Sequence, residues 1–172
     1  DGTLLDSDKS VWAQGRMAWM LLTMYNQVEK RTQWLTWAES GIHFLEKHCV
    51  DQDGRFFFHV TREGLPIRKR RYAFSEAFAA IAQAAYARAT GSDRAAERAI
   101  DLFERFVFLN FTPGAVAAKF TDTRPLTGLA SRMITLVTAR ELTENLGEQP
   151  GLNGWMERVI GEIISLFVKP EE

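Results

Sequence analysis

Runs of mostly apolar residues alternate along the chain with runs that are apolar on one side only. Between Val11 and Val28 only Arg16 is charged, and apolar side chains cover more than one face of the expected helix. Residues 32–48 instead carry a single apolar stripe, which is typical of a helix with one face in solvent. We therefore expect a helix buried on all sides, followed by a helix that covers it.

The same two-helix pattern recurs twice. Residues 73–90 are rich in alanine, Gly91 ends that segment, and Ser92 is a candidate N-cap for an amphipathic helix that follows. Residues 126–146 and 152–167 form the inner and outer members of a third pair.

Between the first and second pairs the helical pattern stops. Residues 51–54 are turn formers, residues 55–61 have the aromatic and β-branched content of a strand, and residues 63–66 turn the chain again. We expect a short β-hairpin there. The basic run at residues 68–71 is interpreted as a solvated rim.

Three helical hairpins, each with a buried and a covering member, predict an all-α architecture of two concentric layers. A closed ring of such hairpins is an (α/α)6 barrel, of which this chain would supply about half. Residues 1–172 are accordingly interpreted as a single partial barrel domain with a β-hairpin insertion.

Charge, polar residues and cysteine content indicate which partners and which cellular compartment to expect. Lys and Arg number 21 against 22 Asp and Glu, so the net charge is -1 and no nucleic-acid partner is expected. Gln14 and Asn26 are too polar for the segment 11–28 to cross a membrane. The single cysteine, Cys49, fits a reducing compartment, and we expect a cytoplasmic protein.

Arg16 is the most informative polar residue. A guanidinium on a buried helix must find a partner, and Trp12 and Trp19 lie one turn away on either side. Aromatic walls beside a cation are common at sugar sites. The alternative is a structural arginine paired to a buried carboxylate such as Glu76, and the residues alone do not decide between the two.

The other candidates are weaker. Arg132 raises the same question as Arg16, and the place of Glu76 in the first turn of its helix has a structural explanation in the helix dipole. His43, His48 and His59 lack metal-ligand spacing and are expected at the surface or in packing contacts. No metal site and no phosphate-binding or dinucleotide-binding motif is recognisable.

Four short motifs follow one another at characteristic spacing. They are Trp12-Ala13-Gln14-Gly15-Arg16 with Trp19, Gly41–Leu45 followed by Asp51–Arg55, Val60–Pro66, and Phe74–Phe78. Together they resemble the W-x-Q-G-R-x-x-W signature and the next motifs of the N-acylglucosamine 2-epimerase family, whose mammalian members are also called renin-binding proteins. The resemblance covers nearly the whole chain, and the fold of that family is an (α/α)6 barrel.

The resemblance implies a sugar 2-epimerase that acts on the open-chain sugar. One base removes the proton at C2 and a second group returns a proton to the other face, work attributed in the family to two histidines in its C-terminal half. Arg16 matches the residue that stabilises the developing oxyanion. Trp12, Phe74 and Glu76 match positions near the barrel mouth and are candidate substrate-binding residues, together with Arg132.

The expected substrates are N-acetylglucosamine and N-acetylmannosamine. In the related cellobiose 2-epimerases and aldose-ketose isomerases, the helix that matches residues 129–134 looks like N-x-N-M-H. This chain has Ile134 at the position of the histidine, which favours the N-acylglucosamine branch. The alternatives are a mannose or cellobiose 2-epimerase or isomerase, and a non-catalytic helical interaction domain. No cofactor is expected. Some members of the branch are activated by ATP, but this sequence contains no recognisable nucleotide site. A homodimer is possible, and the sequence does not decide the oligomeric state.

Overall fold

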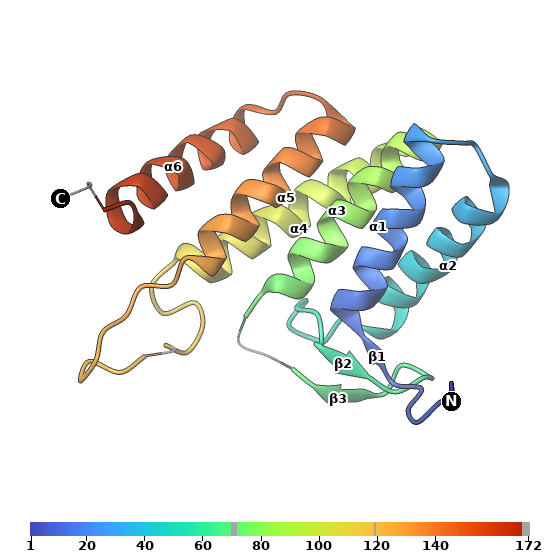
Figure 1. Ribbon diagram of the computed structural model, residues 1–172, viewed down its shortest axis with the longest axis horizontal. Helices are drawn as coiled ribbons and strands as arrows, with labels where there is room; N and C mark the ends of the chain where they lie inside the picture. Colours follow the sequence, from blue (N-terminus) through green and yellow to red (C-terminus); the bar gives the residue numbers. More distant parts are fainter. Residues whose placement is uncertain (70–71, 119, 170–172) are drawn as a thin grey trace.

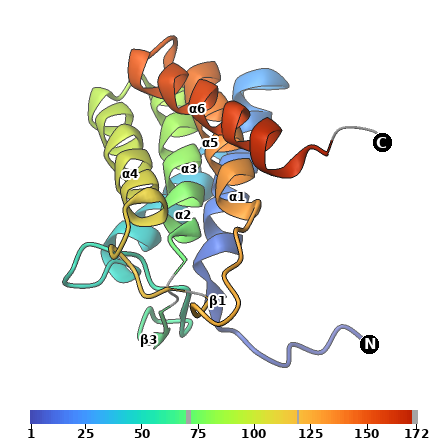
Figure 2. The same cartoon turned by 90° about the vertical axis from the view of Figure 1, so that its left-hand side faces the viewer.

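Six helices form three successive pairs in the computed structural model, which describes residues 1–69, 72–118 and 120–169 (Figure 1). The pairs are α1 (Val11–Gln27) with α2 (Thr32–His48), α3 (Phe74–Thr90) with α4 (Asp93–Phe111), and α5 (Ala130–Leu146) with α6 (Pro150–Phe167). Helices α1, α3 and α5 form one layer, and α2, α4 and α6 cover its outer side (Figures 1 and 2). The predicted order of inner and covering helices is confirmed.

Helix α3 lies between α1 and α5 at the centre of the inner layer (Figure 1). Its alanines allow both neighbours to approach closely, and residues such as Ala80, Ala82 and Ala84 have no exposed surface. Gly91 ends the helix in the left-handed conformation at φ 72°, and Ser92 caps α4 by accepting a hydrogen bond from the N–H of Ala95. Both predicted helix signals are confirmed.

A small antiparallel sheet lies at the end of the molecule where α1 and α3 begin (Figure 1). Strands β2 (His59–Val60) and β3 (Pro66–Arg68) form the predicted hairpin, but β2 is shorter than the expected strand 55–61, and Pro66 lies in β3 and not in the turn. Strand β1 (Lys9–Ser10) adds a third strand that the residue pattern does not indicate. Of the basic run 68–71, Arg70 and Arg71 lie outside the described residues.

Two expectations about the helices are wrong. Helix α1 is not buried on all sides, because Met17 and Met20 are 52% and 42% exposed. Helix α5 begins at Ala130, four residues later than the expected start at Leu126. Gly128 accounts for the later start, since glycine disfavours helix by about 1 kcal/mol relative to alanine.

The main core lies between α3 and α4, where Phe103, Phe106 and Leu102 are buried. In the part of the chain that the structure describes, no helix combines the length and the apolar content that crossing a membrane requires.

Candidate functional site

The sequence candidates gather at one end of the inner layer. Trp12 and Arg16 lie in the first two turns of α1, Phe74 and Glu76 in the first turn of α3, and Arg132 in the first turn of α5. These three helices begin at the same end of the molecule, where the sheet and residues 112–118 and 120–129 also lie (Figure 1). Residues far apart in the sequence therefore share one rim.

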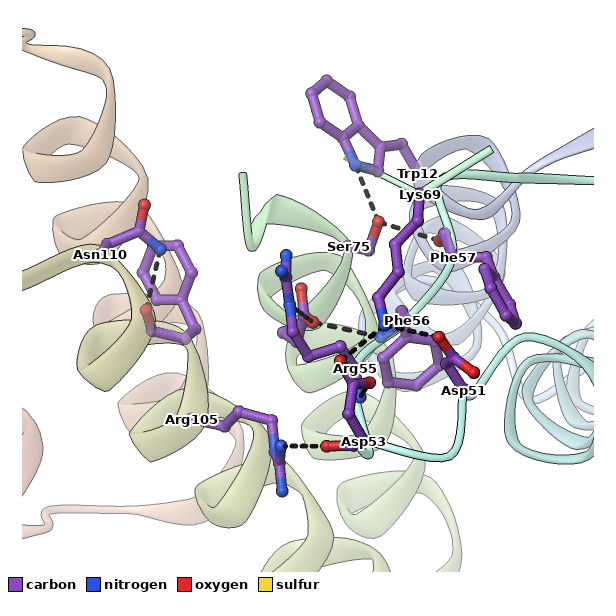
Figure 3. A network of polar contacts seen from close by, with 12 residues as sticks. Trp12, Asp51, Asp53, Arg55, Phe56, Phe57, Lys69, Ser75, Arg105 and Asn110 are labelled. Atoms are coloured by element: carbon purple, nitrogen blue, oxygen red, sulfur yellow. Dashed lines mark hydrogen bonds and ion pairs between the residues drawn. The ribbon is translucent and has the colours of Figure 1, made fainter. Parts of the chain in front are cut away.

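Trp12 forms an aromatic wall at this rim. Its ring meets Phe58 edge-on at 5.0 Å between centroids and lies 5.7 Å from both Phe74 and Phe78. Its indole N–H donates to the Ser75 hydroxyl at 3.0 Å (Figure 3). Trp12 and Phe74 line a cavity of about 750 Å³ that extends beside residues 112–118 and 120–126 towards α5. Aromatic walls of this kind suit the apolar C–H faces of a sugar.

Arg16 lies one turn further along α1 and is exposed. Its Nε–H donates to the Trp12 carbonyl oxygen at 3.3 Å, and its guanidinium carbon lies 5.0 Å from the centre of the Phe78 ring. Within the described residues it forms no ion pair. The alternative that Arg16 pairs with Glu76 is therefore wrong, and its remaining N–H donors are available to a ligand.

Glu76 belongs to a buried polar network with Phe56 and Arg55, at the start of the hairpin segment. Its side chain has no exposed surface, one oxygen accepts the Phe56 N–H at 3.1 Å, and the Arg55 Nε lies 3.6 Å away. Burial raises the pKa of Glu76 above its ordinary value, although the Phe56 N–H and Arg55 act in the opposite direction. The position of Glu76 gives no support to its assignment as a substrate-binding residue, because the carboxylate faces the hairpin and does not line the cavity.

The same network fixes the turn before the hairpin. Lys69 Nζ lies 2.6 Å from a carboxylate oxygen of Asp51 and 2.6 Å from one of Asp53, and it lowers the pKa of both carboxyls. Arg105 of α4 donates to the Asp53 carbonyl oxygen at 3.1 Å (Figure 3). The hairpin is thus held against both α3 and α4.

Arg132 lines the cavity but has a partner on the outer layer. Its Nε lies 2.8 Å from Glu162 of α6, and its Nη1 donates to the Gly128 carbonyl oxygen at 3.0 Å. Arg158, with Arg132, holds the pKa of Glu162 below its usual range. A substrate-binding role for Arg132 stays a prediction, and the ion pair gives the residue a structural role as well.

Three residues around Trp12 and Arg16 have roles that sequence reasoning missed. Ser75 bonds to the Trp12 indole, Phe78 lies under the Arg16 guanidinium, and Gly15 lets α1 approach α3. A Cβ atom at Gly15 would lie 2.9 Å from the Phe78 carbonyl oxygen. Gly15, Ser75 and Phe78 all lie inside the motifs that carry the resemblance, which was the signal available for finding them.

None of the three histidines of the chain lies on an inner helix. His43 and His48 are on the outer helix α2, where His48 packs on Phe44 at 5.1 Å, and His59 is in β2. In residues 1–69, 72–118 and 120–169, no group of His, Cys, Asp and Glu side chains is arranged to hold a metal ion.

In comparisons with known sequences, the chain is similar to sugar 2-epimerases. A family model described as N-acylglucosamine 2-epimerase (GlcNAc 2-epimerase) matches residues 1–169. The N-acylglucosamine 2-epimerase of Bos taurus is 33% identical over 111 residues, which are 62% of this chain and 26% of that protein. A cellobiose 2-epimerase of Eubacterium cellulosolvens is 32% identical over 123 residues, 69% of this chain and 30% of that protein. The chain therefore spans about a quarter to a third of these relatives.

The structure of cellobiose 2-epimerase from Bacillus thermoamylovorans B4167 superposes on 97% of this chain and 47% of that one, with a TM-score of 0.79 and 19% identity. The likeness extends over all three helical pairs. It confirms the predicted fold, about half of an (α/α)6 barrel.

Proposed function

Because the chain belongs to the N-acylglucosamine 2-epimerase family, we propose that the complete protein interconverts N-acetylglucosamine and N-acetylmannosamine. The reaction proceeds on the open-chain sugar. A base removes the proton from C2, the electrons move onto the carbonyl oxygen to give an enolate intermediate, and an acid returns a proton to the opposite face of C2. No redox partner or cofactor is needed, because the same atoms are present before and after.

One observation carries this proposal: Arg16 presents a guanidinium with no carboxylate partner among the described residues, beside an aromatic wall. Negative charge develops on the carbonyl oxygen when C2 loses its proton. A fixed cation lowers the energy of that state more than the energy of the neutral substrate. Arg16 is therefore the proposed oxyanion-stabilising residue, and Trp12 and Phe74 are the proposed walls for the sugar.

The acid and base are proposed to come from inner-layer helices outside this chain. His43 and His48 lie on the outer helix α2, and His59 lies in the sheet. The chain also corresponds to only 47% of the superposed epimerase, so about half of a complete barrel wall is contributed by other residues.

A preference for the acetamido sugar rests on the family resemblance. Ile134 is half-buried against the main core and is not among the cavity-lining residues, so it gives no evidence on substrate choice. Cellobiose epimerisation is the second candidate, and the similarity to the Eubacterium cellulosolvens enzyme favours it.

The test is a comparison of kcat/KM for N-acetylmannosamine, mannose and cellobiose with the complete protein. We expect the acetamido sugar to be preferred and deuterium from heavy water to appear at C2 of the product. Equal or better use of cellobiose would favour the second candidate. Formation of a ketose would indicate an isomerase instead.

The remaining expectations belong to the same proposal. We place the protein in the cytoplasm, which the single and buried Cys49 supports, since a reducing compartment does not require cysteines to pair. A homodimer and activation by ATP stay predictions, to be tested by light scattering and by assays with and without the nucleotide.

A further inference from the structure

Trp12 is held at its polar edge by a residue of another helix. The indole N–H donates to the Ser75 hydroxyl at 3.0 Å, across 63 positions of the sequence (Figure 3). Trp12 is half-buried, and its ring borders the cavity at the rim. The bond therefore joins the cavity wall to the first turn of α3.

Ser75 is itself fixed in direction. It is 3% exposed, and its hydroxyl donates to the Phe57 carbonyl oxygen at 3.3 Å. A hydroxyl has a single proton, and since that proton points at Phe57, the oxygen lone pairs are left to accept the indole N–H. The hairpin, α3 and α1 are thus linked through one oxygen atom.

The ring contacts of Trp12 do not by themselves select one orientation. Phe58, Phe74 and Phe78 confine the indole, but aromatic contacts tolerate several tilts and a flip of the ring about its bond to Cβ. The hydrogen bond distinguishes the flipped states, because only one of them brings Nε1 to Ser75. The face that Trp12 turns to the cavity then depends on the hydroxyl.

We propose that Ser75 is a positioning residue for sugar binding, which sets the orientation of the Trp12 wall through the indole N–H. This inference rests on the proposed function, because a sugar is the ligand that the wall would hold. Arg16 is attached to the Trp12 carbonyl oxygen and to Phe78, not to the indole. Losing the Ser75 hydroxyl therefore disturbs the wall and leaves the oxyanion-stabilising cation in place.

A wall that contacts substrate and transition state equally well affects KM and not kcat. In the complete protein, Ser75→Ala should raise KM by about three- to tenfold, the usual effect of one hydrogen bond, while kcat stays within about twofold. The matched control is Thr138→Val, which removes the hydroxyl of a residue on the inner helix α5 that is also 3% exposed. It should leave KM unchanged.

A double-mutant cycle with Trp12→Phe separates positioning from general packing. Phenylalanine has no N–H, so the Ser75 hydroxyl has no indole to orient in that background. Ser75→Ala should then add no further increase in KM. An increase that is the same in both backgrounds would overturn the inference, since Ser75 would be acting independently of Trp12.

The indole N–H also reports on this contact without any activity. Trp12→Phe identifies the Trp12 signal in an ¹⁵N spectrum of the indole groups, and Ser75→Ala should shift that signal and speed its hydrogen exchange. An unmoved signal would overturn the inference. If the complete protein converts no sugar, the proposed function fails and this spectrum still decides the contact. If it converts sugar but Ser75→Ala leaves KM unchanged, the inference alone fails.

Discussion

Arg16 and Arg132 lie at comparable places on inner helices, but their surroundings leave different groups for a substrate. Arg132 is engaged by Glu162 at 2.8 Å and is covered by the outer helix. Arg16 is exposed and stacks on Phe78. For both residues the sequence leaves open whether the arginine binds a substrate or pairs with a carboxylate. The pattern of residues could not decide this, because the partner of Arg132 lies thirty positions away on another helix.

Arg16→Lys should lower kcat of the complete protein by about 100-fold or more with little loss of stability. Lysine keeps the charge but loses the planar fork that can hold two oxygens. The control is Arg140→Lys on α5, whose side chain is 75% exposed and pairs with Glu144 one turn away. Steady-state kinetics and melting temperatures measured together decide the matter. Near-normal turnover in a folded Arg16→Lys protein would contradict the catalytic role.

Cys49 should resist thiol reagents as long as the chain is folded. It has no exposed surface, and burial raises the pKa of its thiol to about 12. At pH 8 only about one thiol in ten thousand is then ionised, and the thiolate is the reactive form. A colorimetric thiol assay should show no fast reaction with the native protein in buffer, and one reactive thiol per chain when the protein is unfolded in urea. Rapid labelling of native protein would show that the α2 end opens readily.

Glu76 should make stability depend on pH above about 4.5, its ordinary pKa. Burial raises the folded-state pKa, so the contribution of this group is fully present below 4.5 and is lost as the pH rises through the raised value. Glu76→Gln keeps an oxygen for the Phe56 N–H and cannot ionise. Urea titrations should therefore show the wild type losing stability relative to Glu76→Gln as the pH rises. The opposite slope would mean that Arg55 outweighs burial.

At the scale of elements, the periodicity of apolar residues was sufficient to predict the helical pairs. One-sided stripes such as Ala99, Leu102 and Phe106 in α4 are local patterns, and all three residues are buried. Strand β1 has only two residues and no pattern of its own, since its pairing with β2 depends on the fold. The hydrogen bond from Trp12 to Ser75 could not be predicted from the residue pattern either, because no local rule pairs residues on different helices.

Gly15→Ala should destabilise the protein by about 1–3 kcal/mol, the usual cost of overpacking. The new Cβ would lie 2.9 Å from the Phe78 carbonyl oxygen, which belongs to a helix backbone and cannot turn away. Gly41→Ala in α2 is the matched control, because its Cβ would meet Ala18 at an ordinary 3.7 Å. That variant should be neutral or stabilising by up to about 1 kcal/mol, as alanine favours helix. Equal unfolding free energies for the two variants would show that α1 and α3 can separate without cost.

At the scale of the whole molecule, the inner layer has an uncovered face. Met17 and Met20 on α1 and Met133 and Val137 on α5 are 42% to 56% exposed. The described residues leave about half of each side chain uncovered, whereas the superposed epimerase has as much chain again. Apolar surface of this kind associates with other apolar surface in water, so residues 1–172 alone should self-associate. A strictly monomeric species in sedimentation experiments would contradict this expectation.

Residues 1–172 alone should also have no epimerase activity. The reaction needs two acid/base groups placed on opposite faces of C2, and the histidines of this chain lie on the outer helix α2 and in β2, not on an inner helix. Arg16 can stabilise negative charge, but it holds its proton too tightly to act as the base. Conversion of N-acetylmannosamine by the purified 172 residues would show that the base lies within them. If they are inactive and activity appears on adding the rest of a complete chain, both halves contribute to one site.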